Sequence, residues 1–340
     1  MVTRWPIYVV ASLFAATPVL APVSAATLDD VRVRGVIVCG VSEGIAGFSR
    51  ADEDGAWSGQ DVEFCSSLAA AVLGKKDAVK YRPLTPSNRF QALARGEIDV
   101  LASSAAATLS RDTELGIRFA GVSFYDGQGF LVRRGSAVSS VLELSGASVC
   151  VLKGTSAAQG LADFFRRRQM RYQEMPLERW GDLVKAYASG GCTLLTGDVS
   201  LLALERSRLA DPSEHMTLPE LMTKEPLGPA VRQGDEQWFS IVRWTLNALV
   251  AAEEIGLTRE NVDSFKDSEL LDVRRFLGLD ANLGRSMGLD RDWAYAMIKQ
   301  VGNYGEIFDR NLGQQSPLKL DRGINNLWTK GGLMYALPLR

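Results

Sequence analysis

Strand and helix signals alternate along two separate stretches of this chain, and this alternation constrains the fold more than any other feature. In the first stretch, apolar β-prone runs at 36–41, 79–84 and 98–102 are separated by helical patterns at 61–73 and 87–93. Strands that alternate with helices in this way form a mainly parallel sheet with helices on both faces. The first stretch therefore predicts an α/β lobe.

The same order begins again later in the chain. Two strands and two helices are predicted there, at 148–152, 155–168, 180–189 and 192–196. Each unit is too short to account for the whole chain, so the sequence predicts two lobes. Segments 129–134 and 226–232 are the candidate crossings between them. A chain that crosses twice forms a hinge, and a cleft between hinged lobes is a natural ligand site.

The C-terminal third has a different pattern. A long amphipathic helix is predicted at 238–255, and segments rich in Gly, Asn and aromatic residues follow it. We interpret these aromatic side chains as packing positions. A helical C-terminal extension is expected.

The N-terminus has the parts of a secretory signal. Arg4 supplies positive charge, residues 7–20 are largely apolar, and residues 23–25 are small, as cleavage requires. We therefore predict a signal peptide over residues 1–25, which leaves 315 of the 340 residues for two domains. A retained membrane anchor is the alternative, although Pro6 and Pro18 interrupt the apolar run.

The charge balance does not favour nucleic acid as a partner. The chain has 38 basic and 40 acidic residues, a net charge of −2, and no basic face. The arginine run at 166–168 is typical of a solvated helix end. We predict no cofactor.

Four cysteines in an exported chain predict disulfides, and three pairings are possible. We favour Cys39 with Cys65 and Cys150 with Cys192, because each pair then stays within one lobe. Four buried free thiols are the alternative. The wide spacing and the single histidine, His215, argue against a zinc site, and no other metal site is predicted.

A Thr-x-x-Arg pattern follows the strand predicted at 98–102. Thr108 and Arg111 stand at the start of a helix, where a hydroxyl, free backbone amides and a guanidinium can converge on a carboxylate. In an exported chain, this pattern indicates capture of small anionic or zwitterionic molecules outside the cytoplasm.

Eight motifs support a more specific interpretation. They lie, in chain order, at 39–42, 59–62, 96–101, 108–113, 125–130, 224–232, 293–295 and 302–306. With these motifs the chain resembles the periplasmic amino-acid-binding proteins of ABC transporters, specifically the general L-amino-acid-binding type. The resemblance covers essentially all of the chain after the signal.

The resemblance implies a type II periplasmic-binding-protein fold with two crossovers and a C-terminal extension. Residues 26–131 and 232–340 would form lobe 1, and residues 132–231 lobe 2. It implies a periplasmic monomer that captures an amino acid or related small acid and delivers it to an inner-membrane ABC permease. It implies no catalysis.

Roles for single residues also follow from the resemblance. Arg111, assisted by Thr108, would hold the ligand's α-carboxylate, and Asp198 would accept from its α-ammonium. The helix start at Lys153, Thr155 and Ser156 would face the carboxylate. The other predicted ligand-binding residues are Ser42, Glu43 and Ser104. A surface ion pair for Arg111 and a helix cap for Asp198 are the alternatives.

The chain departs from the family pattern at residues 103–107, which read Ser-Ser-Ala-Ala-Ala. Ala106 stands where a carboxylate-binding threonine is expected, and a hydrogen bond to a charged group contributes about 1.5–3 kcal/mol. Ala107 predicts a roomier pocket, and Thr193 replaces a usual acidic residue. We therefore expect weaker binding of ordinary amino acids than in typical relatives.

Two other functions remain open. A ligand-sensing receptor module would use the same cleft but signal to a membrane partner. A dehydratase-like enzyme on this scaffold needs a general acid or base, for which Glu43 is a candidate, but no second catalytic partner is evident.

Overall fold

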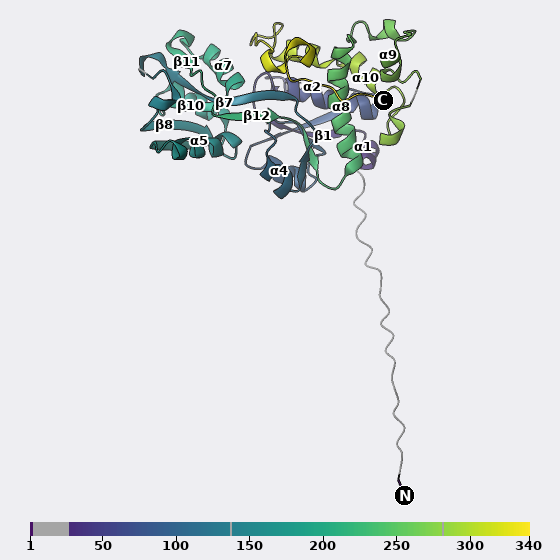
Figure 1. Ribbon diagram of the computed structural model, residues 1–340, viewed down its shortest axis with the longest axis horizontal. Coiled ribbons are helices and arrows are strands. Elements are labelled where there is room, and N and C mark those ends of the chain that lie inside the picture. The colour runs from purple at the N-terminus through teal and green to yellow at the C-terminus, as the bar shows by residue number, and fades with distance from the viewer. Residues whose placement is uncertain (3–26, 137, 281) are drawn as a thin grey trace.

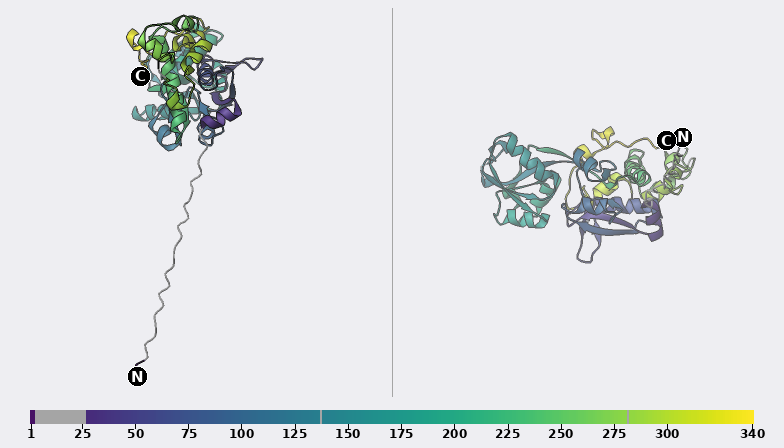
Figure 2. Two further views of the ribbon diagram at one scale, coloured as in Figure 1. Left: turned by 90° about the vertical axis from the view of Figure 1, so that its right-hand side faces the viewer. Right: turned by 90° about the horizontal axis from the view of Figure 1, so that it is seen from below.

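The computed structural model describes residues 1–2, 27–136, 138–280 and 282–340. Two sheets, each covered by helices, form two lobes that lie side by side and are joined by extended strands (Figures 1 and 2). Apart from Met1 and Val2, the predicted signal peptide lies outside the described residues.

The first lobe contains a five-stranded sheet in the order β4-β1-β5-β13-β6. Its parallel strands are β1 (Ile37–Ser42), β4 (Val79–Leu84) and β5 (Val100–Leu101); β6 (Ile117–Phe119) and β13 (Ala230–Arg232) are antiparallel to each other. The helices of this lobe are α1 (Thr27–Arg34), α2 (Gln60–Leu73), α3 (Arg89–Ala94), α4 (Leu109–Glu114) and α8 (Glu236–Glu254). The predicted strand–helix order is confirmed, although β5 is shorter than expected.

The second lobe contains a sheet in the order β11-β7-β10-β8-β9, with β12 also paired to β7. β8 (Ala147–Leu152) runs parallel to β9 (Tyr172–Leu177) and β10 (Leu194–Asp198). β7 (Phe124–Arg133) runs antiparallel to β10 and to β11 (His215–Thr217). The helices α5 (Ser156–Arg167), α6 (Trp180–Ala188) and α7 (Val199–Arg208) bury apolar faces against this sheet.

Both favoured disulfides are present. Cys39–Cys65 joins β1 to α2, and Cys150–Cys192 joins β8 to the residues just before β10. All four cysteines are buried, and each bond stays within one lobe. A cross-lobe bond would have tied the lobes together, so this pairing leaves them free to move about the hinge.

Two antiparallel strands run between the lobes. β7 pairs with β12 (Thr223–Leu227) from Phe124↔Leu227 to Gln128↔Thr223. The adjoining residue Gly129 pairs with Gly197 of the second sheet, whereas Arg232 pairs with Ile117 of the first. The ladder formed by β7 and β12 is therefore the connection about which the lobes can bend.

The predicted helical C-terminal extension packs on the first lobe. It comprises η4 (Val262–Phe265), α9 (Leu271–Phe276), η5 (Arg285–Met287), α10 (Trp293–Gln300), α11 (Tyr304–Asn311), η6 (Gly323–Asn325) and η7 (Trp328–Lys330). Side chains of α10 and α11 share one apolar core with α2 and α8. Within the described residues, no helix is both long enough and apolar enough to cross a bilayer.

Candidate functional site

A cleft between the lobes brings together six of the predicted ligand-binding residues. Its lining includes three from the first lobe and three from the second, namely Ser42, Glu43, Ser104, Thr155, Ser156 and Asp198. These residues are up to 156 positions apart in the sequence, 42 to 198. The fold therefore gathers most of the predicted set at one place.

The second-lobe wall is formed by the beginning of α5. Thr155 is the N-cap of this helix: its Oγ1 accepts from Ala158 N at 3.3 Å. The next residue, Ser156, donates from Oγ to Glu225 Oε2 at 2.6 Å. The helix start thus presents its positive dipole end to the cleft, as expected for binding an anionic group.

Lys153 lies outside the cleft lining. Its ammonium is exposed and pairs with Glu178 Oε1 at 2.8 Å. Glu178 also accepts from Ser87 Oγ of the first lobe at 3.0 Å, so this exposed group contributes to a contact between the lobes. The lobes approach closely here, because a Cβ on the following residue, Gly154, would lie 3.1 Å from Pro86.

Arg111 is buried, at 7% exposure, beside the cleft rather than among its lining residues. Its Nη1 donates to Ala106 O at 2.7 Å, and its guanidinium lies 5.0 Å from the centre of the Phe90 ring. Burial lowers its pKa, whereas the charges of Glu225 and Asp198 raise it. Arg111 therefore does not form the surface ion pair considered as an alternative.

Thr108 acts as a helix cap in this structure. It precedes α4, and its Oγ1 accepts from Arg111 N at 3.4 Å. It is also absent from the cleft lining. Its direct role here is to orient the turn that carries Arg111.

Arg89 lines the cleft and was missed by the sequence analysis. It is 5% exposed, its Nη1 donates to Ser103 O at 3.0 Å, and its Nε has no hydrogen-bond partner among the described residues. Burial lowers its pKa to about 9, so the guanidinium is still charged at neutral pH. Its guanidinium also lies 4.9 Å from the Phe90 ring, which places Arg89 and Arg111 against the same aromatic side chain.

The sequence contained one usable signal for Arg89. It begins a helix that buries Ala92 and Leu93, and a cation at a helix N-terminus opposes the favourable charge order of the helix dipole. A cation that interacts unfavourably with the helix dipole and is also buried is typical of a functional position.

Three carboxyl groups, those of Asp198, Asp126 and Glu225, lie near one another, and of these Asp198 lines the cleft. Asp198 is the N-cap residue of α7, yet its side chain makes no capping hydrogen bond in the structure. Burial, together with the charges of Asp126 and Glu225, raises its pKa well above the usual value. Asp126 accepts from Ser200 Oγ, and burial raises its pKa to about 6. Asp198 thus stands in the cleft rather than capping its helix.

Asp61 supports the first-lobe wall from behind. Ser104, a non-glycine residue with a φ of 47°, donates from Oγ to Asp61 Oδ2 at 2.7 Å. Burial raises the Asp61 pKa to about 6. Ser42 donates to Ser103 O at 2.8 Å, the same oxygen that Arg89 contacts. The 103–104 turn is therefore held from several sides.

Ala106 does not line the cleft. Its side chain is buried in an apolar cluster, here named the hinge cluster, whose buried members are Phe48, Ala106, Phe124, Leu227, Phe308 and Leu312. Its backbone oxygen accepts from Arg111. Ala106 therefore supplies no hydroxyl to the cleft. Its backbone carbonyl holds Arg111, and its side chain makes an apolar contact.

Asp61 should make stability depend on pH. Its folded-state pKa of about 6 exceeds the ordinary 3.8, so the native state binds more protons than the unfolded state between these values. Its contribution to the free energy of unfolding should fall by roughly 3 kcal/mol as pH rises from about 4 to about 6. Urea denaturation of wild type and Asp61→Asn at pH 4.5 and 7 tests this: the variant should gain stability relative to wild type at pH 7. Parallel pH dependence of the two proteins would contradict it.

The family model of the bacterial extracellular solute-binding proteins, family 3, matches residues 37–260. The chain belongs to this family. The family relationship confirms the resemblance found in the sequence, and the two-lobed fold is the expected one for such a solute-binding protein.

Several relatives are similar over nearly their whole length. The general L-amino acid-binding periplasmic protein AapJ of Rhizobium johnstonii is 51% identical over 319 residues, which cover 93% of this chain and 94% of AapJ. The glutamate/glutamine/aspartate/asparagine-binding protein BztA of Rhodobacter capsulatus is 46% identical, covering 97% and 98%.

A solved structure gives the same result. The ABC transporter periplasmic binding protein from Brucella ovis with glutathione bound matches with a TM-score of 0.90 and 47% identity, covering 93% of this chain and 100% of that chain. The family model ends at residue 260. The matches to BztA and to the Brucella ovis structure cover 97% and 93% of this chain, so they also include its C-terminal extension.

Proposed function

We propose that this protein captures an amino acid or related small acid between its lobes and delivers it to an inner-membrane ABC permease. One observation carries the proposal: Arg89 of the first lobe and Asp198 of the second line the same cleft, and the charge of Asp198 acts on both Arg89 and the neighbouring Arg111. A zwitterion needs a cationic and an anionic partner on opposite sides. The amino-acid-binding names of AapJ and BztA agree with this ligand class.

Each charged group has a distinct proposed role. Arg111 binds the α-carboxylate, Asp198 accepts from the α-ammonium, and Arg89 receives a second anionic group. Arg89 suits this last role because it lines the cleft with an unpartnered buried Nε, and among the described residues it forms no ion pair. Acids with two carboxylates, such as glutamate or glutathione, are therefore the expected ligands. The similar Brucella ovis protein, whose structure has glutathione bound, supports the choice of glutathione as a candidate.

The remaining parts of the proposal concern the whole molecule. Residues 1–25 would direct export, and the mature protein would act as a periplasmic monomer without catalytic activity. Residues 26–131 and 232–340 would move as one lobe and residues 132–231 as the other. The periplasmic relatives and the β7–β12 ladder support these assignments.

A thermal-shift screen tests the proposed function. The compounds are the twenty amino acids, glutathione and simple dicarboxylic acids, followed by calorimetry and an assay for turnover of each compound that binds. At a ligand concentration one hundred times the Kd, binding should stabilise the protein by about 2.7 kcal/mol. If no amino acid or small acid raised the melting temperature, the proposed ligand class would be wrong.

Arg89→Gln should change ligand preference. The substitution keeps a polar side chain but removes the charge that would meet a second carboxylate, so glutamate should lose roughly 1.5–3 kcal/mol of binding free energy. Glutamine, which lacks that second charge, should lose much less. Calorimetry on both ligands measures the difference, and equal losses would contradict the assignment.

Asp198→Asn should reduce binding of zwitterions selectively. The amide keeps the size of the side chain but removes the charge that meets the ammonium, so an amino acid should lose 1 to 2 orders of magnitude in affinity, roughly 1.5–3 kcal/mol. The matching acid without an amino group should bind the variant as well as, or better than, wild type. Paired calorimetric titrations with glutamate and glutarate decide this, and equal weakening of both would overturn it.

A further inference from the structure

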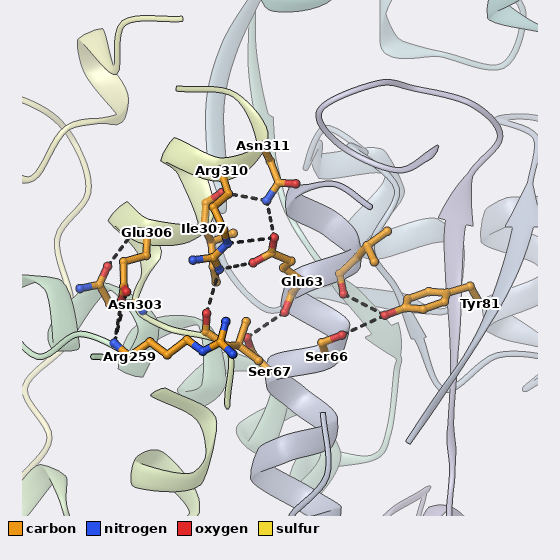
Figure 3. Close-up of polar contacts among 12 residues, drawn as sticks. Glu63, Ser66, Ser67, Tyr81, Arg259, Asn303, Glu306, Ile307, Arg310 and Asn311 are labelled. Atoms are coloured by element: carbon orange, nitrogen blue, oxygen red, sulfur yellow. Dashed lines mark hydrogen bonds and ion pairs between the residues drawn. The ribbon is translucent and has the colours of Figure 1, made fainter. Parts of the chain in front are cut away.

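The C-terminal extension reaches from the first lobe to the second, and its base is fixed. Glu63 of α2 pairs with Arg310 of α11 and accepts from Asn311 Nδ2 at 2.8 Å (Figure 3). Arg310 also donates to Val301 O at 2.8 Å. Helix α11 is therefore firmly attached to the first lobe.

The extension also holds the first residues of the hinge. Tyr304 Oη donates to Ser123 O at 2.8 Å. The Asn325 side chain accepts from Tyr125 N at 2.6 Å and donates to Tyr125 O at 2.9 Å, as a paired strand would. These contacts fix the start of β7, where the connection to the second lobe begins.

Residues 313–320, here named the hinge strap, continue from α11 toward the second lobe. Figure 1 shows the yellow C-terminal segment near the strands that join the lobes. The strap returns on itself, because Leu320 N donates to Leu312 O at 2.8 Å. Leu318 of the strap packs against the hinge cluster and also against the second-lobe core that contains Trp180 and Leu201.

The strap lies directly behind the cleft. A Cβ on Gly47 would lie 2.7 Å from Leu318 Cδ1, so Leu318 is in close contact with the loop that carries Ile45 and Phe48. Both of these side chains line the cleft. Ile45, like Leu318, packs against both apolar clusters. Opening the lobes would separate these apolar contacts and expose their surface to water, which is unfavourable.

From these contacts we propose that Leu318 is a positioning residue: the hinge strap supports the apolar cleft wall and maintains a fraction of closed protein before ligand binds. The strap lies outside residues 37–260, which the family model matches. The apparent affinity of a protein that binds in its closed form scales with the closed fraction. The strap therefore increases affinity without touching the ligand, an inference that rests on the proposed function.

Leu318→Ala tests the proposal in two ways. Small-angle X-ray scattering of the ligand-free variant should show a larger radius of gyration than wild type. Calorimetry should show affinities for glutamate and glutamine that both fall by the same factor, about tenfold, so that their ratio is unchanged. Leu318→Met, which retains apolar volume, should restore both properties to within about twofold of wild type.

Leu333→Ala is the matched control. Leu333 is also in the extension but is 53% exposed and belongs to neither cluster, so its loss should change neither scattering nor affinity. Unchanged scattering in Leu318→Ala would overturn the proposal, as would a loss of affinity for one ligand alone. If wild type binds no small acid, the proposed function fails, and the scattering comparison still decides the role of the strap.

Discussion

Arg111→Ala is expected to weaken binding of the physiological ligand by about 2–5 kcal/mol, the largest effect of any single substitution in the site. The loss is large because the ligand carboxylate would be buried in the closed cleft without its partner. Removing Arg111 also releases the Ala106 carbonyl, which now accepts from Nη1 at 2.7 Å. Calorimetric titration with the best ligand from the thermal-shift screen measures the effect.

Arg118→Ala is the matched control for this experiment. Arg118 lies in β6 of the same lobe, where it pairs with Glu236 at 2.7 Å and stacks on Phe239, and it does not line the cleft. Its loss should leave affinity unchanged even if stability falls. Binding by Arg111→Ala with wild-type affinity would show that Arg111 is a structural arginine, and Arg89 would then be the main carboxylate partner.

Loss of the Cys150–Cys192 bond is expected to destabilise the protein by about 4 kcal/mol. The bond closes a loop with a sequence separation of 42, and the chain-entropy model gives that value for such a loop. The Cys39–Cys65 loop, with a separation of 26, should contribute slightly less, about 3.5 kcal/mol. Urea denaturation of the double Cys→Ala variant of each pair measures both values.

The disulfide experiment also separates stability from binding. Because each bond lies within one lobe, its removal should leave ligand affinity unchanged at temperatures where the variant remains folded. A change in unfolding free energy below about 1 kcal/mol would show that the denatured chain gains little freedom from opening the loop.

For a solute-binding protein, the charge arrangement has a simple consequence. With the proposed roles of Arg111, Arg89 and Asp198, a zwitterionic ligand would pair with opposite charges of the two lobes and would so stabilise the closed form. The contacts between the lobes at Ser87–Glu178 and at Leu318 act in the same direction but do not depend on the ligand. Under these two proposals, affinity would reflect both the direct contacts with the ligand and the free energy of closing the lobes.

Local sequence determined most of the fold. The alternation of apolar β-prone runs with amphipathic helices predicted both sheets, because these periodicities require only neighbouring residues to be compared. The strand at 79–84 and the helix beginning at Trp180 start where they were predicted. The cysteine pairing also followed from lobe membership, since only two of the four residues fall in each unit.

The tertiary structure alone decided which side chains face the cleft. Lys153 and Thr155 are two residues apart at one helix start, yet only Thr155 lines the cleft, whereas the exposed Lys153 side chain pairs with Glu178 at the edge of the cleft. The only signal for Arg89 in the sequence was a cation at a helix start, and its place in the cleft emerges from its burial against Ser103 and Phe90. Recognition depends on distances between segments far apart in the chain, and these are set by the packing of the two lobes and not by any local pattern.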